Sequence, residues 1–255
     1  MKTQRIISFD GVELAVHRLA PIDGPARPVL LLHGLFSSAE VNWIKFGHAR
    51  RLADAGFEAI MPDLRAHGAS AVPQGPDSYP PNVLVKDTLA LANALALEPG
   101  GFDLVGFSLG ARTSVQAVLA GLSPRRLLLG GMGLEGLGEW QRRSAFFIDA
   151  IDRFDEIRST DDPAYFAKSF MRTMKVDRAA ARLLLLSVED TPPAALDRIA
   201  MPTLVFCGAQ DNDNGSATAL AAALPDASYV EVPGTHMSSV TEPAFGETIV
   251  TFVKA

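Results

Sequence analysis

Short and almost continuous apolar runs alternate with helical stretches along most of this chain. The runs are rich in Val, Leu and Ile, which is typical of strands that are covered on both faces of a parallel sheet. Such runs occupy residues 4–9, 13–20, 28–34, 57–63, 102–108, 125–131, 203–211 and 228–234, and helical stretches occupy residues 39–55, 82–97, 109–121, 215–224 and 243–254. Asp10 and Gly11 separate the first two runs and predict a hairpin there. A hairpin followed by strand–helix alternation predicts an α/β fold whose sheet is mostly parallel.

One interval, residues 132–199, lacks a strand pattern. Its aromatic residues recur at helical spacing instead, with Trp140 and Phe147 in one stretch and Phe166 and Phe170 in the next. An all-helical excursion between two core strands predicts a cap inserted after the sixth strand, with residues 1–131 and 200–255 forming the core. Each aromatic side chain then either packs the cap against the core, which is the commoner role, or contacts a substrate.

The composition excludes several classes of function. The chain has 255 residues, of which 48% are hydrophobic, so it is long enough for one large domain with a substantial core. Its 29 acidic residues modestly outnumber its 23 basic ones and form no block, which argues against binding to nucleic acid or to an anionic membrane surface. Apolar runs stay well short of the roughly 18 residues that a membrane span needs, so no transmembrane helix is expected.

The N-terminal pattern and the single cysteine bear on location. Asp10 and Glu13 interrupt the first residues before the apolar core of a signal peptide could form. Cys207 is the sole cysteine and has no partner for an intramolecular disulfide. A reducing, cytoplasmic location is therefore the expectation. The sequence leaves open whether the protein is a monomer or a homodimer.

The sequence GFSLG at residues 106–110 places Ser108 between two glycines. It follows an apolar run that predicts a buried strand and precedes an amphipathic helix. This is the context of a nucleophile elbow, a turn so tight that Gly106 and Gly110 have little room for a side chain. The helix that follows directs backbone N–H groups and the positive end of its dipole toward the site. Ser108 is therefore the candidate nucleophile.

A serine hydroxyl needs a base, and the base needs a carboxylate that orients it. His236 lies in a loop after the last predicted strand, from which its side chain can reach the end of the sheet. Asp211 directly follows the penultimate strand, at the carboxyl end where the ligand-facing residues of open α/β sheets gather. Asp213 and Glu135 are rival candidates for the acid. We predict that Ser108, Asp211 and His236 form a catalytic triad.

The four other histidines are assigned structural roles. His17 falls in the predicted hairpin and His48 in an early helix, where surface or packing roles are the commoner ones. His33 and His67 lie at strand ends, and we expect them to organise loops rather than to act as bases.

The order Ser, Asp, His, together with LLLHG at residues 30–34, resembles the α/β-hydrolase superfamily. The resemblance extends over nearly the whole chain and implies an α/β-hydrolase fold with an eight-stranded, mostly parallel sheet, flanking helices and a helical cap. In that family the N–H after a His-Gly and the N–H after the nucleophile stabilise the oxyanion, which implies Leu35 and Leu109 here. The loop DLRAHGAS (residues 63–70) resembles a family pattern with glycine in place of Ala66.

Serine at the elbow points to acyl transfer, because superfamily members that open epoxides or displace halides use aspartate there. The resemblance therefore implies a carboxylesterase that cleaves esters of short to medium acyl chains through an acyl-enzyme. Hydrolysis of a carbon–carbon bond or of an enol-lactone by the same triad is an alternative. Arg112 and Arg65 are the candidate partners for the carboxylates of such substrates. A ligand-binding receptor with slow or no turnover is a third alternative.

The cap and the loops supply candidate residues for a substrate pocket. These are Phe36, Trp140, Phe147, Phe170 and Met237. No metal or other cofactor is expected, because the histidines and the cysteine lack spacings such as H-E-x-x-H or paired C-x-x-C. The expected partner is a small-molecule ester.

Overall fold

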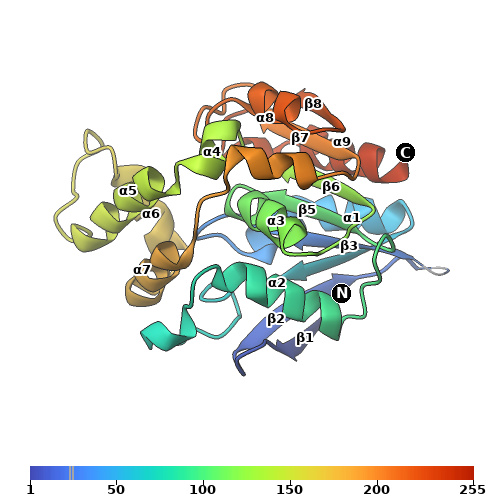
Figure 1. Cartoon of the computed structure of the whole chain (residues 1–255). Helices are drawn as coiled ribbons and strands as arrows, with labels where there is room; N and C mark the ends of the chain where they lie inside the picture. Colours follow the sequence, from blue (N-terminus) through green and yellow to red (C-terminus); the bar gives the residue numbers. More distant parts are fainter. Residues whose placement is uncertain (23, 25) are drawn as a thin grey trace.

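The computed structural model describes residues 1–22, 24 and 26–255. An eight-stranded sheet runs through its centre, with strand order β1-β2-β4-β3-β5-β6-β7-β8 (Figure 1). The strands are β1 (Lys2–Ile7), β2 (Glu13–Leu19), β3 (Arg27–Leu32), β4 (Phe57–Pro62), β5 (Asp103–Phe107), β6 (Arg126–Gly130), β7 (Thr203–Gly208) and β8 (Ala227–Val232). The β1–β2 and β2–β4 pairs are antiparallel and the others are parallel. The predicted α/β fold and its mostly parallel sheet are confirmed.

Helices cover both faces of this sheet (Figure 1). α1 and α9 contribute to one hydrophobic cluster, and α2, α3 and α8 contribute to the other. Their bounds are α1 (His48–Asp54), α2 (Val83–Ala94), α3 (Leu109–Leu119), α8 (Ala217–Ala223) and α9 (Pro243–Lys254). The central strands β3 and β5 lie between the two clusters and are almost entirely buried. Burial on both faces explains why their sequences are continuously apolar rather than alternating.

The helix predicted over residues 39–55 is interrupted, and that prediction is wrong in detail. A single turn of π-helix spans Glu40–Ile44, and α1 begins only at His48. Gly47 separates them with a φ of +80°, a left-handed conformation that glycine adopts without steric cost. The apolar spacing continues across Gly47, which is why the pattern by itself predicts one helix.

The base of β5 is held by an ionic cluster around one buried carboxylate. Asp103 is fully buried and accepts hydrogen bonds from Arg27 at 3.1 Å and Arg125 at 3.0 Å. Both guanidinium groups also donate to the carbonyl oxygen of Val253 near the end of α9. Removing either partner of a buried ion pair leaves an uncompensated charge, so this cluster fixes the strand that carries Ser108.

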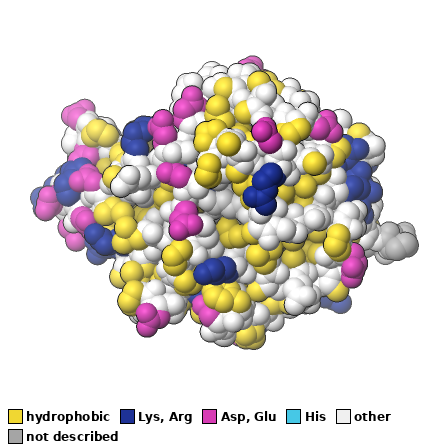
Figure 2. All heavy atoms as spheres, in the orientation of Figure 1, with side chains coloured by type: hydrophobic (Ala, Val, Ile, Leu, Met, Phe, Trp, Pro, Cys, Tyr) yellow, Lys and Arg dark blue, Asp and Glu magenta, His cyan; other side chains and the backbone are white. Residues whose placement is uncertain are grey.

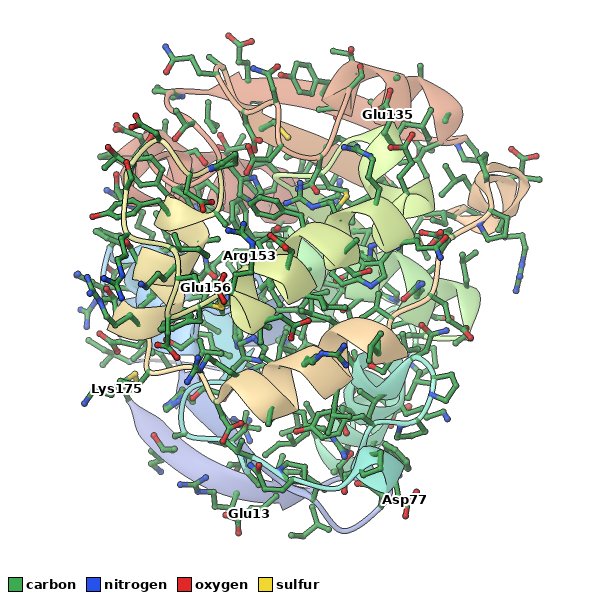
Figure 3. The ribbon with its side chains drawn as sticks, turned by 90° about the vertical axis from the view of Figure 1, so that its left-hand side faces the viewer. Glu13, Asp77, Glu135, Arg153, Glu156 and Lys175 are labelled. Atoms are coloured by element: carbon green, nitrogen blue, oxygen red, sulfur yellow. The ribbon has the colours of Figure 1, made fainter. Side chains whose placement is uncertain are left out.

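Between β6 and β7 the chain forms four α-helices, α4 (Leu134–Gly138), α5 (Trp140–Asp152), α6 (Tyr165–Thr173) and α7 (Arg178–Ser187), followed by a 3-10 helix at Pro193–Arg198. Figure 1 shows α5, α6 and α7 together beyond the ends of the central strands. Figure 3 views the molecule from that side, with Arg153 and Glu156 in front of the sheet. Arg153 pairs with Asp149 at 2.7 Å and Asp162 at 3.0 Å, which ties the loop after α5 to its helix.

Acidic and basic side chains intermingle on the face shown in Figure 2, with both signs on the lobe formed by α5, α6 and α7. This face therefore carries no extended patch of one charge. Among the described residues no helix combines the length and apolar character needed to cross a membrane.

Candidate active site

Ser108 occupies a strained turn between β5 and α3. Its φ of +53° and ψ of −114° lie outside the regions that non-glycine residues favour. A Cβ added at Gly106 would collide with the carbonyl group of Gly110, and one added at Gly110 would collide with the carbonyl group of Leu32. The two glycines therefore permit the close approach that holds Ser108 at the end of the strand, as a nucleophile elbow requires.

The side chains of Ser108, His236 and Asp211 form a continuous hydrogen-bonded chain. The Nε2 atom of His236 lies 3.0 Å from the Oγ atom of Ser108, and its Nδ1 atom lies 2.8 Å from an Oδ atom of Asp211. All three residues come from loops at the carboxyl ends of strands: β5, β7 and β8. The structure thus brings together the three residues that the sequence proposes as a triad.

The Asp211 carboxylate is almost completely buried, with 2% of its side chain exposed. Burial raises the pKa of Asp211, but hydrogen bonding and attraction to His236 outweigh it, and the pKa lies below its ordinary value. The N–H of Asp213 adds a further hydrogen bond to the carboxylate, at 3.1 Å. Asp211 is therefore ionised at neutral pH, and hydrogen bonds to His236 and to the N–H of Asp213 orient its carboxylate.

The two N–H groups named as oxyanion donors are available. Within the described chain neither Leu35 N–H nor Leu109 N–H donates to a protein acceptor, and both residues line the same cavity as Ser108. The next N–H, that of Phe36, donates to Nε2 of His67 at 2.9 Å. This bond fixes the loop that carries Leu35.

His33 and His67 organise that loop as neutral side chains. His33 accepts the N–H of Leu64 at 2.9 Å through Nε2 and faces the carbonyl of Gly34 with Nδ1. Burial lowers the pKa of His33, and it lowers the pKa of His67 to about 3. Ala66, which takes the place of a glycine in the family pattern, adopts a φ of +62° one residue before His67.

A cavity of about 650 Å³ opens over Ser108 and His236, within the size range of small-molecule sites. Its wall is mostly apolar and combines the loops at the strand ends with α5 and α6. The five candidate pocket residues all line it: Phe36, Trp140, Phe147, Phe170 and Met237. Met237 is 54% exposed, whereas Trp140 is buried and donates its indole N–H to Leu185 O at 2.9 Å.

A family model described as "Alpha/beta hydrolase family" matches residues 29–245, which is most of the chain. The chain belongs to the alpha/beta hydrolase family. The family match spans β3 to the start of α9 and includes all three residues of the hydrogen-bonded chain.

Individual relatives match only part of the chain. The chain is 29% identical over 96 residues to epoxide hydrolase A of Mycobacterium tuberculosis and 34% identical over 113 residues to an epoxide hydrolase of Caballeronia sordidicola. These matches cover 38% and 44% of this chain, but only 28% and 32% of the relatives. The chain thus matches about a third of the length of these proteins.

Solved structures with a similar fold match the whole chain or almost all of it. A hydrolase from Pseudomonas aeruginosa is 25% identical with a TM-score of 0.76, covering 100% of this chain and 99% of its own. An esterase from Exiguobacterium antarcticum is 18% identical with a TM-score of 0.78, covering 100% of both chains. An enol-lactonase from Burkholderia xenovorans is 22% identical with a TM-score of 0.72, covering 99% of this chain and 100% of its own. The last two likenesses show the shared hydrolase fold.

The rival acids have other contacts in this member of the alpha/beta hydrolase family. An Oε atom of Glu135 accepts the N–H of Ser216 at 2.7 Å, and Figure 3 places Glu135 beside the segment that contains α8. Asp213 lines the cavity, but it is Asp211 whose carboxylate bonds His236.

Arg65 and Arg112, named as partners for a substrate carboxylate, are engaged within the protein. Arg65 is fully buried and pairs with Asp10 and Asp87, each at 2.7 Å, outside the cavity. Arg112 lines the cavity, but it donates to the carbonyl of Glu189 at 3.0 Å and to the carbonyl of Gly136. The structure therefore does not place Arg65 at the site, and it gives Arg112 a role in joining the helices after β6 to α3.

Two cations of the cavity wall, Arg142 and Arg143, were not among the candidates from the sequence. Arg143 lies three residues after Trp140 and four before Phe147, so helical spacing puts all three on one face of α5. That spacing is the signal that could have found it. Among the described residues no cluster of three or more His, Cys, Asp or Glu side chains forms a metal site.

Proposed function

We propose that this protein is a serine hydrolase that cleaves carboxylic esters through an acyl-enzyme. The observation that supports this most is the hydrogen-bonded chain from Ser108 through His236 to Asp211, at the floor of an apolar cavity. A serine within 3.0 Å of an imidazole that is itself oriented by a carboxylate has the geometry of an activated nucleophile.

The proposed reaction has two halves. The Oγ atom of Ser108 attacks the ester carbonyl while Nε2 of His236 takes its proton, and the oxyanion accepts hydrogen bonds from the N–H groups of Leu35 and Leu109. The C–O bond then breaks, the alcohol leaves with the proton from His236, and the acyl group remains on Ser108. A water that gives its proton to His236 attacks this acyl-enzyme, which releases the acid and restores the serine.

The nucleophile separates this proposal from epoxide hydrolysis. Epoxide-opening members of the superfamily use an aspartate at the elbow because they form an alkyl ester that water can cleave. Ser108 would form an ether instead, which water does not cleave under mild conditions. Serine at this position favours acyl transfer.

The apolar wall favours an acyl group of short to medium length as the buried part of the ester. Phe36, Phe147 and Phe170 line this space together with Met237, which is 54% exposed. We propose these four residues as the substrate-contacting part of the wall, whereas Trp140 packs between Arg112 and α7.

Covalent labelling tests the proposal. A fluorophosphonate probe reacts with activated serines, so mass spectrometry should find the adduct on the peptide that contains Ser108. His236→Ala should slow labelling at least about a hundredfold, because the base that activates the serine is lost. Labelling elsewhere, or equal labelling of both proteins, would contradict the proposal. If the probe labels Ser108 and the protein turns over a lactone or a carbon–carbon substrate but no simple ester, the alternative reaction is supported. If the probe labels Ser108 and no substrate is turned over, a receptor is supported.

A further inference from the structure

Arg143 is a cation of the cavity wall that forms no ion pair with a carboxylate of the described residues. It lies in the first turns of α5 and is partly buried. Its Nη1 group donates to the main-chain carbonyl oxygen of Asp213, and its guanidinium lies 5.7 Å from the centre of the Phe147 ring. Neither Nε–H nor the Nη2 group donates to an acceptor in the part of the chain that the structure describes.

The other two arginines of the wall differ from Arg143. Arg142 pairs with Glu139 at 2.8 Å, and 74% of its side chain is exposed. Arg112 is 1% exposed, with its donors on main-chain carbonyls and Asp190 at 3.5 Å. Arg143 alone among the three combines partial burial with donors that form no hydrogen bond to the described residues, in a cavity whose wall is mostly apolar.

The charges around Arg143 do not neutralise it directly. Asp211 is committed to His236, and the carboxylate of Asp213 attracts Arg143 without forming an ion pair. Burial lowers the pKa of Arg143, yet the group remains a cation at neutral pH. A guanidinium that has lost part of its hydration in this way favours an added carboxylate, with which it can form charge-assisted hydrogen bonds.

We propose that Arg143 forms an anion subsite of the cavity and that the preferred esters carry a carboxylate on the part of the substrate that lies under α5. This inference rests on the proposed ester hydrolysis at Ser108 and names its substrate class. The carboxylate binds the free donors of Arg143, the apolar wall around Phe147 holds the carbon chain, and the ester carbonyl lies at Ser108.

Matched esters test the subsite. Half-esters of succinic, glutaric, adipic and pimelic acid with nitrophenol are compared with neutral counterparts in which an isopropyl group replaces the free carboxylate. Uncatalysed release is subtracted for each compound, because a neighbouring carboxylate accelerates it. We expect kcat/KM to be at least about tenfold higher for one half-ester than for its neutral counterpart. A hydrogen bond to a charged group contributes about this much to binding. The chain length with the largest ratio reports the distance between Arg143 and Ser108.

Three variants and one control variant assign this preference to a residue. Arg143→Met should abolish the preference by raising KM for the half-ester, and Arg143→Lys should retain part of it. Asp213→Asn, which removes the nearest competing carboxylate, should increase the preference. Arg142→Met is the matched control for a neighbouring arginine that is already paired, and it should keep the wild-type ratio. The ratio of two esters on one variant cancels a general loss of folded enzyme.

The two proposals fail in different ways. If the wild type hydrolyses neutral esters but shows no preference for a half-ester, or if Arg143→Met keeps that preference, the subsite is wrong and ester hydrolysis stands. If the wild type hydrolyses neither kind of ester, ester hydrolysis is wrong, and thermal unfolding with the free dicarboxylic acids decides the subsite. Stabilisation of the wild type but not of Arg143→Met then supports an anion site, and equal or absent stabilisation overturns it.

Discussion

The main-chain N–H of Phe36 donates a 2.9 Å hydrogen bond to Nε2 of His67, one residue beyond the proposed oxyanion donor Leu35. This bond ties the loop after β3 to the loop after β4. The orientation of Leu35 N–H therefore depends on a side chain that does not itself reach the substrate.

Replacing His67 by Ala should reduce kcat about tenfold or more with little change in KM. A displaced oxyanion donor weakens transition-state stabilisation, and loss of such a donor outright costs about a hundredfold or more. His67→Gln offers another acceptor to Phe36 N–H and should recover part of kcat. Steady-state kinetics on folded protein checks this, and an unchanged kcat in His67→Ala would show that the loop is held by other contacts.

Stability should fall as the pH decreases from about 7 to about 5. Burial lowers the pKa of His33, His48 and His67 from the ordinary 6.5. In this range the unfolded chain takes up protons that the folded chain does not, so lower pH favours unfolding by up to about 1.4 kcal/mol per pH unit for each such histidine.

Denaturant unfolding at several pH values measures this slope. His67→Gln, which cannot titrate, should show a shallower slope than the wild type by about one proton, because the pKa of His67 in the folded state is about 3. An identical slope in the two proteins would mean that His67 titrates alike in the folded and unfolded states.

Asp211→Asn should lower kcat about a thousandfold to ten-thousandfold, because the neutral amide no longer stabilises the protonated imidazole or selects its tautomer. Asp213→Asn retains the main-chain N–H that bonds Asp211 and should keep most of the activity on neutral esters. Comparing the two kcat values decides which rival is the acid. A larger loss in Asp213→Asn would reverse the assignment.

Arg112→Met should destabilise the protein by about 3 kcal/mol, as loss of a buried, hydrogen-bonded cation does. The carbonyl groups of Gly136 and Glu189 would lose their donor, and Trp140 would lose the guanidinium that lies 4.9 Å from its ring centre. Chemical unfolding gives this value, with the exposed Arg142→Met as the control. Unchanged stability together with selective loss of activity on half-esters would instead make Arg112 the substrate partner.

The strands and the elbow were predictable because their signals are local. Continuous apolar runs indicate buried parallel strands, and Gly106 and Gly110 flank Ser108 in sequence as they do in space. The order of strands in the sheet gives Asp211 and His236 their places at the same edge, which is why the resemblance to a known fold was informative for the triad.

Contacts between distant segments were not predictable in the same way. Nothing near Arg143 in the sequence shows that it meets the carbonyl of Asp213, 70 residues away. The break at Gly47 was missed for a different reason, since a glycine inside an apolar pattern is compatible with a continuous helix as well as with a turn. The pairing of Arg65 with Asp10 and Asp87 likewise joins three segments whose proximity only the folded chain reveals.

Release of nitrophenol from a series of nitrophenyl esters of increasing acyl length, by the wild type and by Ser108→Ala, measures directly whether Ser108 hydrolyses esters. We expect turnover by the wild type, with an optimum at a short to medium chain, and a loss of at least about a thousandfold in the variant. Equal rates for the two proteins, or no turnover of any ester by the wild type, would contradict ester hydrolysis by Ser108.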